Sequence, residues 1–304
     1  MEIGLVDLFD GSAQRDLAYM RTFALTAEAA GFSALWLPEH LVFFEEYESA
    51  YPYPAAPSSA NPDVVEVHKY GDAAATAPRV EAAQEQGLLD VLQAAAELCR
   101  HTTRLRVGSS VLLLPMRDPR LLVRELATLD LFTGGRFDMG VGVGWSAEEF
   151  AAAGVPFAER GARCESNLAR VSELWGRTGD EPGVPAMPDT GRPLPRILVG
   201  GHSKAAIRRA ARYAGGWYPW NLTTGDFSRH LAEVEAGLRE NGRSREDFHV
   251  VAGLRFHGAL AELRPMVERY LELGANGVNL SLRMTPENYG DVMHEISQAL
   301  GLAV

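Results

Sequence analysis

Cysteine, long apolar runs and positive charge are all scarce in this sequence of 304 residues. The two cysteines, Cys99 and Cys164, are too few for a disulfide framework, which favours a cytoplasmic location. No apolar run is long enough to span a bilayer, and the first residues, MEIGLVDLFDGS, lack the pattern of a signal peptide. Against 40 acidic residues stand 29 lysines and arginines, a net charge of −11. We therefore expect neither nucleic acid nor a membrane as a partner.

Two kinds of catalytic motif are also missing. The eight histidines are scattered, with no H-x-H and no H-E-x-x-H, so we expect no metal centre. A G-x-S-x-G nucleophile elbow is absent as well. These absences argue against metal-dependent hydrolases and against α/β-hydrolase esterases.

What the sequence does contain is a regular alternation of strand-like and helix-like segments. The strand-like segments lie at 2–8, 33–37, 105–113, 136–143, 195–200, 215–220, 248–255 and 276–282. A helical pattern follows each of them, near 16–30, 88–102, 119–132, 159–176, 203–214, 226–242, 261–273 and 287–301. Eight βα units in a chain of this length predict a single (β/α)8 TIM barrel over residues 1–304. A doubly wound sheet is the competing architecture.

Two connections are unusual. Residues 42–87 follow the second strand, show no clear periodicity and are rich in alanine, proline, acids and tyrosine. In a barrel this long βα loop would rise from the catalytic face, so we expect it to act as a lid that excludes water. The glycine- and proline-rich segment 177–194 precedes a strand, a position less suggestive of chemistry.

The apolar strand at 33–37 leads into LPEHL, which places Glu39 and His40 at the start of a βα loop. Catalytic residues of barrels favour this position, and histidine titrates near neutral pH. A helix cap or a structural loop histidine is an equally good reading of position alone.

Glycines cluster at the end of the fourth strand, in GGRFDMGVGVGW (134–145). Gly140, Gly142 and Gly144 would let the backbone approach a flat ligand closely, although packing within the barrel wall would also require them. The segment is not a dinucleotide fingerprint, because Trp145 occupies the place of the third glycine in G-x-G-x-x-G.

A second glycine turn lies in ILVGGHSKAAIRRAARYAGGW (197–217). Gly200 and Gly201 end a strand and Ser203 can cap the next helix, an arrangement that offers free N–H groups and a positive dipole end to a phosphate. The helix carries four cations and no acid, and a solvated face is the competing reading for its arginines. The four cations are Lys204, Arg208, Arg209 and Arg212.

Taken together, these motifs resemble the luciferase-like superfamily of barrel oxidoreductases, which use flavin or the deazaflavin coenzyme F420. The likeness is strongest to the deazaflavin branch. The segments that carry it are AEAAGFSALWLPEHL (27–41), residues 102–150, GVPFAERGARCESNLARVSELW (154–175) and the second glycine turn.

The resemblance implies roles for eleven residues. His40 matches the active-site histidine of related deazaflavin dehydrogenases, and Glu39 matches an acid that contacts the cofactor. Ser110–Val111 match the site of a non-proline cis peptide bond that supports the tricyclic ring. The other implied cofactor contacts, to the ring or to the phosphate, are Gly142, Gly144, Trp145, Gly200, Gly201, His202 and Ser203.

The resemblance also implies the function: hydride transfer between F420 and a small organic substrate, with His40 moving the substrate's proton. An FMN-dependent monooxygenase is the alternative, and a barrel that binds a ligand or partner without catalysis is a second. Phe44 stands where some relatives carry tryptophan, and segment 177–194 is shorter than usual, so the substrate stays open. So does the direction of transfer. Since relatives are often dimers, a homodimer is expected.

Overall fold

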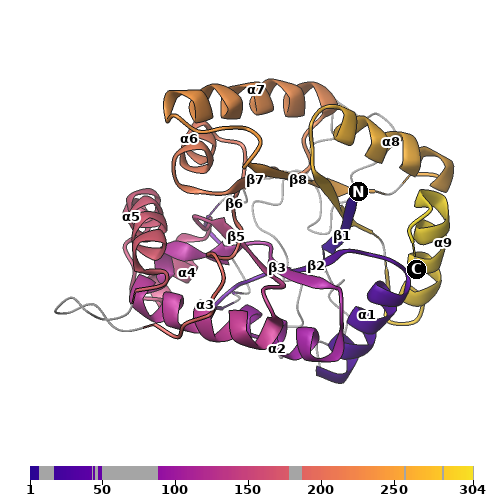
Figure 1. Ribbon diagram of the computed structural model, residues 1–304, viewed down its shortest axis with the longest axis horizontal. Coiled ribbons are helices and arrows are strands. Elements are labelled where there is room, and N and C mark those ends of the chain that lie inside the picture. The colour runs from indigo at the N-terminus through magenta and orange to yellow at the C-terminus, as the bar shows by residue number, and fades with distance from the viewer. Residues whose placement is uncertain are drawn as a thin grey trace.

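A closed parallel barrel forms the centre of the computed structural model, which describes residues 1–6, 17–42, 44, 47–49, 88–177, 187–256, 258–282 and 284–303 (Figure 1). Its strands are β1 (Glu2–Val6), β2 (Ala34–Leu37), β3 (Arg106–Ser109), β4 (Leu112–Leu113), β5 (Phe137–Gly142), β6 (Ile197–Gly200), β7 (Gly216–Tyr218), β8 (His249–Arg255) and β9 (Gly277–Ser281). Neighbouring strands pair in the order β3-β2-β1-β9-β8-β7-β6-β5-β4, and β3 also pairs with β5, which closes the sheet. Because β4 continues β3, these two strands share one position, and the barrel has eight strand positions. The barrel prediction is confirmed, and the doubly wound sheet is wrong.

Helices surround the barrel in the described part of the chain (Figure 1). They are α1 (Leu17–Ala29), α2 (Val91–His101), α3 (Pro119–Thr133), α4 (Ala147–Ala152), α5 (Arg160–Leu174), α6 (Lys204–Tyr213), α7 (Thr224–Glu240), α8 (Leu260–Glu272) and α9 (Tyr289–Leu300). Local sequence sets their ends: Asp118 caps α3 and Pro119 occupies its first position, where no N–H is needed, while Gly134 ends it at φ +64°. The short α4, between β5 and α5, has no counterpart among the predicted helices.

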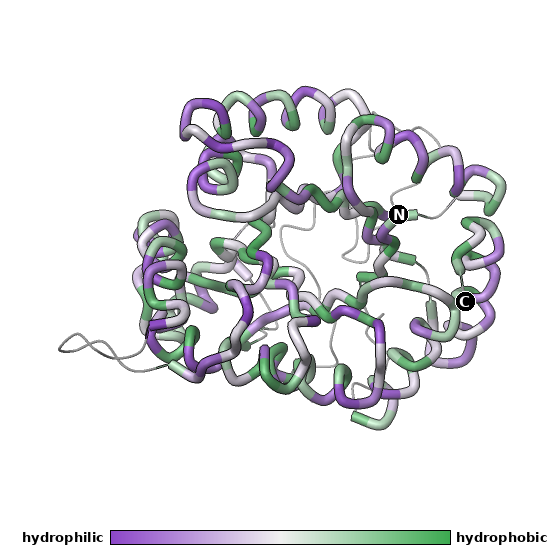
Figure 2. Tube along the Cα trace, in the orientation of Figure 1, coloured by the Kyte–Doolittle hydropathy of each residue, from purple (hydrophilic) through white to green (hydrophobic). Residues whose placement is uncertain are grey.

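The core has two layers, one between the sheet and the helices and one inside the barrel. Along β8 the side chains of Val250, Ala252 and Leu254 pack outward, whereas Val251 packs inward. The inner cluster consists of Val6, Ala34, Trp36, Leu198, Tyr218 and Val251, with Val111 and Trp220 packed against it. The helices accordingly alternate between hydrophobic and hydrophilic residues along their length (Figure 2). Because side chains along a strand alternate between its two faces, Gly253 and Arg255 of β8 lie on the inward side with Val251.

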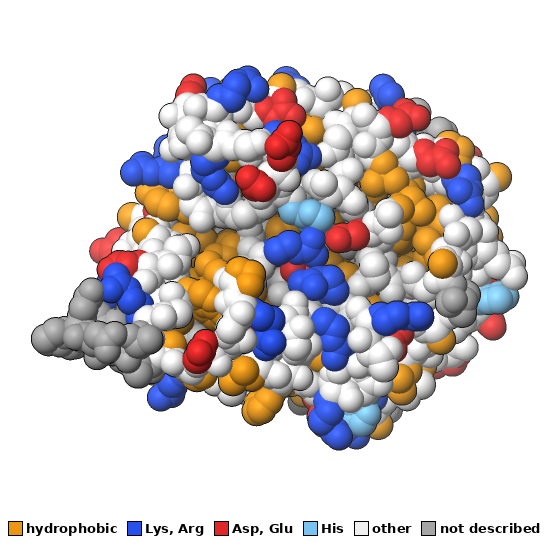
Figure 3. Space-filling model, in the orientation of Figure 1, with side chains coloured by type: hydrophobic (Ala, Val, Ile, Leu, Met, Phe, Trp, Pro, Cys, Tyr) orange, Lys and Arg blue, Asp and Glu red, His pale blue; other side chains and the backbone are white. Residues whose placement is uncertain are grey.

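Charged residues fill the end of the barrel at which the strands begin. We call Glu2, Arg106, Asp138, Arg196 and His249 the basal charge cluster. Asp138, whose side chain is 1% exposed, accepts hydrogen bonds from Nε of Arg106 and Nε of Arg196, each at 2.8 Å. His249 Nε2 lies 2.9 Å from Glu2 and 2.9 Å from Arg196. Acidic, basic and histidine side chains gather near the centre of the face in Figure 3.

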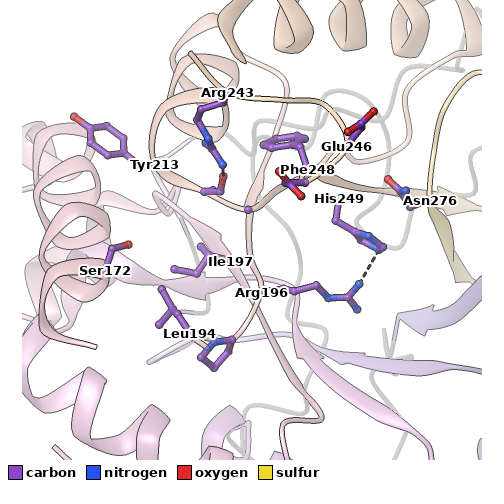
Figure 4. A pocket seen from close by; sticks show the side chains of 14 residues that line it. Ser172, Leu194, Arg196, Ile197, Tyr213, Arg243, Glu246, Phe248, His249 and Asn276 are labelled. Atoms are coloured by element: carbon purple, nitrogen blue, oxygen red, sulfur yellow. Dashed lines mark hydrogen bonds between the residues drawn. The ribbon is translucent and has the colours of Figure 1, made fainter. Parts of the chain in front are cut away.

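A pocket of about 480 Å³ lies beside this cluster, at the starts of β6, β7 and β8 (Figure 4). Both arginines that line it already have partners within the protein. Arg196 pairs with Asp138, and Arg243 donates to the carbonyl oxygens of Ala211 and Ala214 at the end of α6, at 2.9 and 2.7 Å. These cations hold the fold together and are not available to a ligand.

Two expectations concern segments that are only partly described. Of the long connection 42–87, residues 43, 45, 46 and 50–87 lie outside the described residues, as do 178–186 of the connection before β6. The lid prediction therefore stays a prediction. Within the described ranges, no helix combines the length and the apolar character that crossing a bilayer requires.

Candidate active site

His40 lies three residues beyond the end of β2, and a buried carboxylate holds its ring. Its Nδ1 is 3.2 Å from Oε2 of Glu149, whose side chain is 1% exposed, while that of His40 is 24% exposed. The other oxygen of Glu149 accepts the backbone N–H of Leu41. Because Glu149 occupies Nδ1, Nε2 is the nitrogen through which His40 can exchange a proton with a bound molecule.

Glu149 lies on α4 and was not among the predicted site residues. Ser146, Ala147, Glu148 and Glu149 form an S-x-x-E pattern, which by itself indicates a capping box. Half of that box is present: the hydroxyl of Ser146 accepts the N–H of Glu149 at 3.0 Å. The carboxylate of Glu149 turns instead to His40 and Leu41, so the visible sequence signal pointed to a structural role.

The neighbouring acid, Glu148, ties the chain that follows His40 to α4. Its Oε1 accepts the backbone N–H groups of Glu48 and Ser49 at 2.7 and 2.9 Å. Burial alone would raise the pKa of Glu148, but these and other hydrogen bonds lower it to about 2. The two adjacent acids of α4 thus fix both His40 and the backbone beyond it.

Aromatic rings adjoin His40 on this side. The ring of Trp145 packs edge-on to that of His40, with 6.3 Å between the ring centroids, and its centroid lies 5.0 Å from that of Tyr47. The hydroxyl of Tyr47 accepts the N–H of Phe44 at 3.1 Å. Phe44, the departure from relatives that carry tryptophan, packs edge-on against Tyr47 at 5.6 Å. Trp145 therefore lies beside His40, and its predicted cofactor contact stays a prediction.

Glu39 points to protein groups. Oε2 accepts the N–H of Leu113 at 2.5 Å, and Oε1 pairs with the guanidinium of Arg117. Arg117 is also 3.5 Å from Asp90. Each oxygen of Glu39 thus has a partner within the chain, which anchors the end of β2 to β4. Its predicted contact with the cofactor stays a prediction.

The peptide bond between Ser110 and Val111 is cis, as predicted. It separates β3 from β4 at the end of the barrel where the strands finish. The hydroxyl of Ser110 is 3.1 Å from that of Tyr218, inside the barrel. Val111 packs against the inner cluster and remains partly exposed.

We call the end of the barrel where the strands finish the mouth. Along part of its wall the residues are glycines, which carry no side chain. A Cβ on Gly142 would lie 2.4 Å from Val111 Cγ2, and a Cβ on Gly200 would lie 3.0 Å from Val111 Cγ1. Val111 therefore fills the space that both glycines leave, and its apolar side chain is partly exposed. Gly144 has a φ of +76°, and a Cβ there would lie 2.6 Å from Phe150, so it forms a turn that packs against α4. Its predicted cofactor contact stays a prediction.

The second glycine turn joins β6 to α6. Gly201 has φ +90°, a conformation that favours glycine, and its carbonyl accepts the indole N–H of Trp217 at 2.7 Å. The hydroxyl of Ser203 caps α6 by accepting the N–H of Ala206 at 3.2 Å. The first turn of α6 contains no acid, so the positive end of the helix dipole is not neutralised there.

His202, within this turn, is half-buried and stacks near His230 at 5.7 Å between ring centroids. Burial, and then the neighbouring His230, lower the pKa of His202. A neutral imidazole at this position leaves the backbone N–H groups of the turn as the positive element facing an anion.

The arginines of α6 are partly accounted for by packing. Arg208 and Arg209 lie 2.8 and 3.3 Å from Glu165 of α5. These two residues join α6 to α5, which favours the structural reading for them. The phosphate prediction therefore depends on the turn and not on these two arginines.

The chain matches known proteins over most of its length. A family model described as luciferase-like monooxygenase matches residues 69–273. An uncharacterised protein of Mycobacterium tuberculosis is 32% identical over 249 residues, which are 79% of this chain and 78% of that protein.

Solved structures share the fold. A riboflavin lyase, solved with modified FMN and riboflavin, has a TM-score of 0.72 at 16% identity, covering 100% of this chain and 92% of that one. The coenzyme F420 dependent tetrahydromethanopterin reductase of Methanopyrus kandleri has a TM-score of 0.67 at 13% identity, covering 98% of each chain. At these identities the likeness shows the fold alone.

Proposed function

The chain belongs to the luciferase-like monooxygenase family, and we propose that within it the chain transfers hydride between coenzyme F420 and a small organic substrate. The observation that carries this proposal is the pair of His40 and Glu149 at the mouth of the barrel, with Nδ1 of the histidine 3.2 Å from a buried carboxylate. A histidine held in this way is suited to proton transfer rather than to packing.

The residues present fit a tricyclic ring. Gly142 and Gly200 carry no side chain, and Val111 lies between them with its isopropyl group partly exposed. A Cβ on Gly142 would overlap the side chain of Val111, and a Cβ on Gly200 would crowd it. This surface can support one face of a flat ring.

The residues also fit the phosphate that F420 carries. Gly201, His202 and Ser203 lead into α6, whose first turn offers backbone N–H groups and no acid. The same turn suits the phosphate of FMN. The phosphate turn therefore supports a flavin-type cofactor in general without choosing between the two.

When bound, reduced F420 supplies a hydride and oxidised F420 accepts one. The protein must then move one proton to or from the substrate. Glu149 fixes the ring of His40 through Nδ1, so that Nε2 exchanges the proton. Trp145 packs against the same ring and helps to keep water from it.

An FMN-dependent monooxygenase is the alternative, since Val111 and the phosphate turn would suit FMN equally. The riboflavin lyase with modified FMN has the same fold. Reduced flavin reacts readily with oxygen and reduced deazaflavin does not, so the identity of the cofactor decides between the two reactions.

Cofactor titration tests the proposal. The purified protein is titrated with F420 and with FMN, and binding is followed by the quenching of cofactor fluorescence. We expect F420 to bind at least ten times more tightly than FMN, and Gly201→Val to weaken the binding severely, because a β-branched residue cannot adopt φ +90°. Gly242→Ala, at a similar φ of +67° beyond α7, is the control for a strained turn far from the site. Tight binding of FMN without binding of F420 would overturn the assignment.

A further inference from the structure

Arg255, the last residue of β8, is a buried cation at the mouth of the barrel. The residue is 8% exposed. It shares the inward-facing side of β8 with Val251 and Gly253, and Val251 belongs to the inner cluster. Its guanidinium lies 5.7 Å from the ring of Trp220, which packs against that same cluster. Arg255 therefore points into the space above the inner core.

No carboxylate of the described residues lies within ion-pair distance of Arg255. Other arginines of this molecule have such a partner: Arg209, which is 7% exposed, pairs with Glu165 at 3.3 Å, and the partly exposed Arg106 and Arg196 share Asp138. A charge taken out of water is costly unless a partner of opposite sign is supplied. A ligand can supply the partner that the fold does not.

The position of Arg255 is fixed before any ligand arrives. Its backbone N–H donates to Oδ1 of Asn221 at 3.3 Å, and Asn221 donates its own N–H to the carbonyl of Gly253 at 2.7 Å. Asn221 has φ +47°, a left-handed conformation that turns the chain after β7 toward β8. Trp220, just before it, forms the shelf under the guanidinium. Because the backbone of Arg255 is fixed and its side chain is buried, the residue loses little freedom when it binds an anion.

Arg255 lies apart from the cofactor surfaces. Val111 lies just before β4, Gly142 and Gly200 end β5 and β6, and the phosphate turn follows β6. Going round the barrel, β8 is separated from β6 by β7 and lies three strands from β5. The cation thus faces the part of the mouth that a cofactor on the Val111 wall leaves to the substrate.

We propose that the substrate is an anion and that Arg255 binds its carboxylate or phosphate group. The inference rests on the proposed function, because it names the substrate class of the same site. A guanidinium binds either group through two parallel hydrogen bonds, and the shelf of Trp220 supports its plane. A neutral substrate would leave Arg255 without a partner of opposite charge.

The test needs no cofactor. The quenching of tryptophan fluorescence is measured while wild type is titrated with pyruvate, with inorganic phosphate and with neutral acetone. We expect at least one anion to bind and acetone not to bind. Arg255→Gln should weaken the anion at least tenfold, and Arg255→Lys should bind it with intermediate affinity, because it keeps the charge and loses the paired geometry. The variant Trp220→Phe shows whether Trp220 is the tryptophan whose fluorescence is quenched.

Arg106→Gln is the matched control, since it removes a cation from the inside of the same barrel at the opposite end. It should leave anion binding unchanged and lower the unfolding temperature. Arg255→Gln should do the reverse, with an unfolding temperature equal to or above that of wild type, because it removes an unpaired buried charge. This difference also shows that loss of binding by Arg255→Gln does not come from misfolding.

Each outcome decides between the proposals. If pyruvate binds and phosphate does not, the anion is a carboxylate, and the reverse result indicates a phosphate. The role of Arg255 would be overturned if neither anion binds, whether or not acetone does. It would also be overturned if wild type and Arg255→Gln bind the anion equally well. If the anion binds through Arg255 but F420 fails to bind, the proposed function is wrong and the anion site stands.

Discussion

The two ends of the barrel interior differ in whether their charged side chains are paired with charges of opposite sign. At the base, Asp138 receives two arginines, and His249 joins Glu2 to Arg196. At the mouth, Arg255 has no carboxylate partner among the described residues, and His40 is held at one nitrogen by Glu149. Charges that satisfy one another stabilise the fold, whereas charges left for a ligand lower stability and provide function.

A single strand contains both situations. The inward side of β8 runs from His249, in the basal charge cluster, through Val251 and Gly253 to Arg255 at the mouth. The same alternation that buries Val251 therefore delivers a paired group at one end and an unpaired one at the other. The contrast arises from what the neighbouring strands supply at each level, not from β8 itself.

The largest effect should come from His40. We expect His40→Ala to lower turnover by about 10²–10⁴-fold, because a positioned general acid or base contributes about that much. The dissociation constant for the cofactor should change by less than about tenfold, or 1.4 kcal/mol, since the phosphate turn lies on other elements. Steady-state kinetics and fluorescence titration measure the two quantities. His294→Ala, on α9, is the control, and normal turnover by His40→Ala would make His40 structural.

At the base the corresponding change should affect stability and not turnover. Asp138→Asn leaves Arg106 and Arg196 without their shared carboxylate, and breaking a buried ion pair in this way costs about 3–5 kcal/mol. Urea denaturation measures the loss. Turnover per folded molecule should stay within about twofold of wild type. A stable Asp138→Asn with reduced turnover would erase the contrast between the two ends.

A fall in pH should also lower the stability of the basal charge cluster. Burial alone would raise the pKa of Asp138, but Arg106 and Arg196 outweigh it and lower the pKa in the folded state. The lowered pKa contributes stability that is fully present above about pH 4, the pKa of an unfolded aspartate, and is lost as the pH falls through the folded pKa. Wild type should therefore lose stability more steeply than Asp138→Asn below about pH 4.

The next effect separates the two acids of α4. Glu149→Gln should lower kcat by about 10- to 100-fold with little change in KM, because it disturbs the orientation of His40 and no substrate contact. Glu149→Asp should restore part of the activity. The adjacent Glu148→Gln, which can still accept the N–H groups of Glu48 and Ser49, is the control. Equal losses in both variants would mean that Glu149 acts only by holding α4 in place.

Periodicity alone predicted the barrel. All eight predicted strands overlap observed ones, because a run of buried apolar residues followed by a helical pattern is a local signal. Helix α4 was missed because its six residues are too few to show a period. A residue's place in a βα loop and the family resemblance also singled out His40, whose catalytic role stays a prediction.

The sequence could not show the contacts that depend on distant residues. Glu2 and His249 are separated by 247 positions and meet only in the closed barrel. Arg255 reads as an ordinary cation at a strand end, because nothing local tells whether an acid lies opposite. Glu149 was hidden differently, since its S-x-x-E pattern indicated a cap. Paired and unpaired charges are thus indistinguishable until the strands are placed side by side.

The smallest effect compares two helix N-termini. Ser203 caps α6, whose first turn has no acid, and Thr223 caps α7, whose first turn contains Asp226. Removing the hydroxyl of Ser203 loses one hydrogen bond, and removing that of Thr223 loses two, at roughly 1 kcal/mol each. Ser203→Ala should weaken cofactor binding about fivefold, because the phosphate needs the undisturbed first turn of α6. Thr223→Ala should reduce the free energy of unfolding by at least that amount and leave cofactor affinity unchanged, because Asp226 already neutralises that helix end. If the two variants weaken the cofactor equally, the effect is a general loss of stability, and the phosphate does not bind at α6.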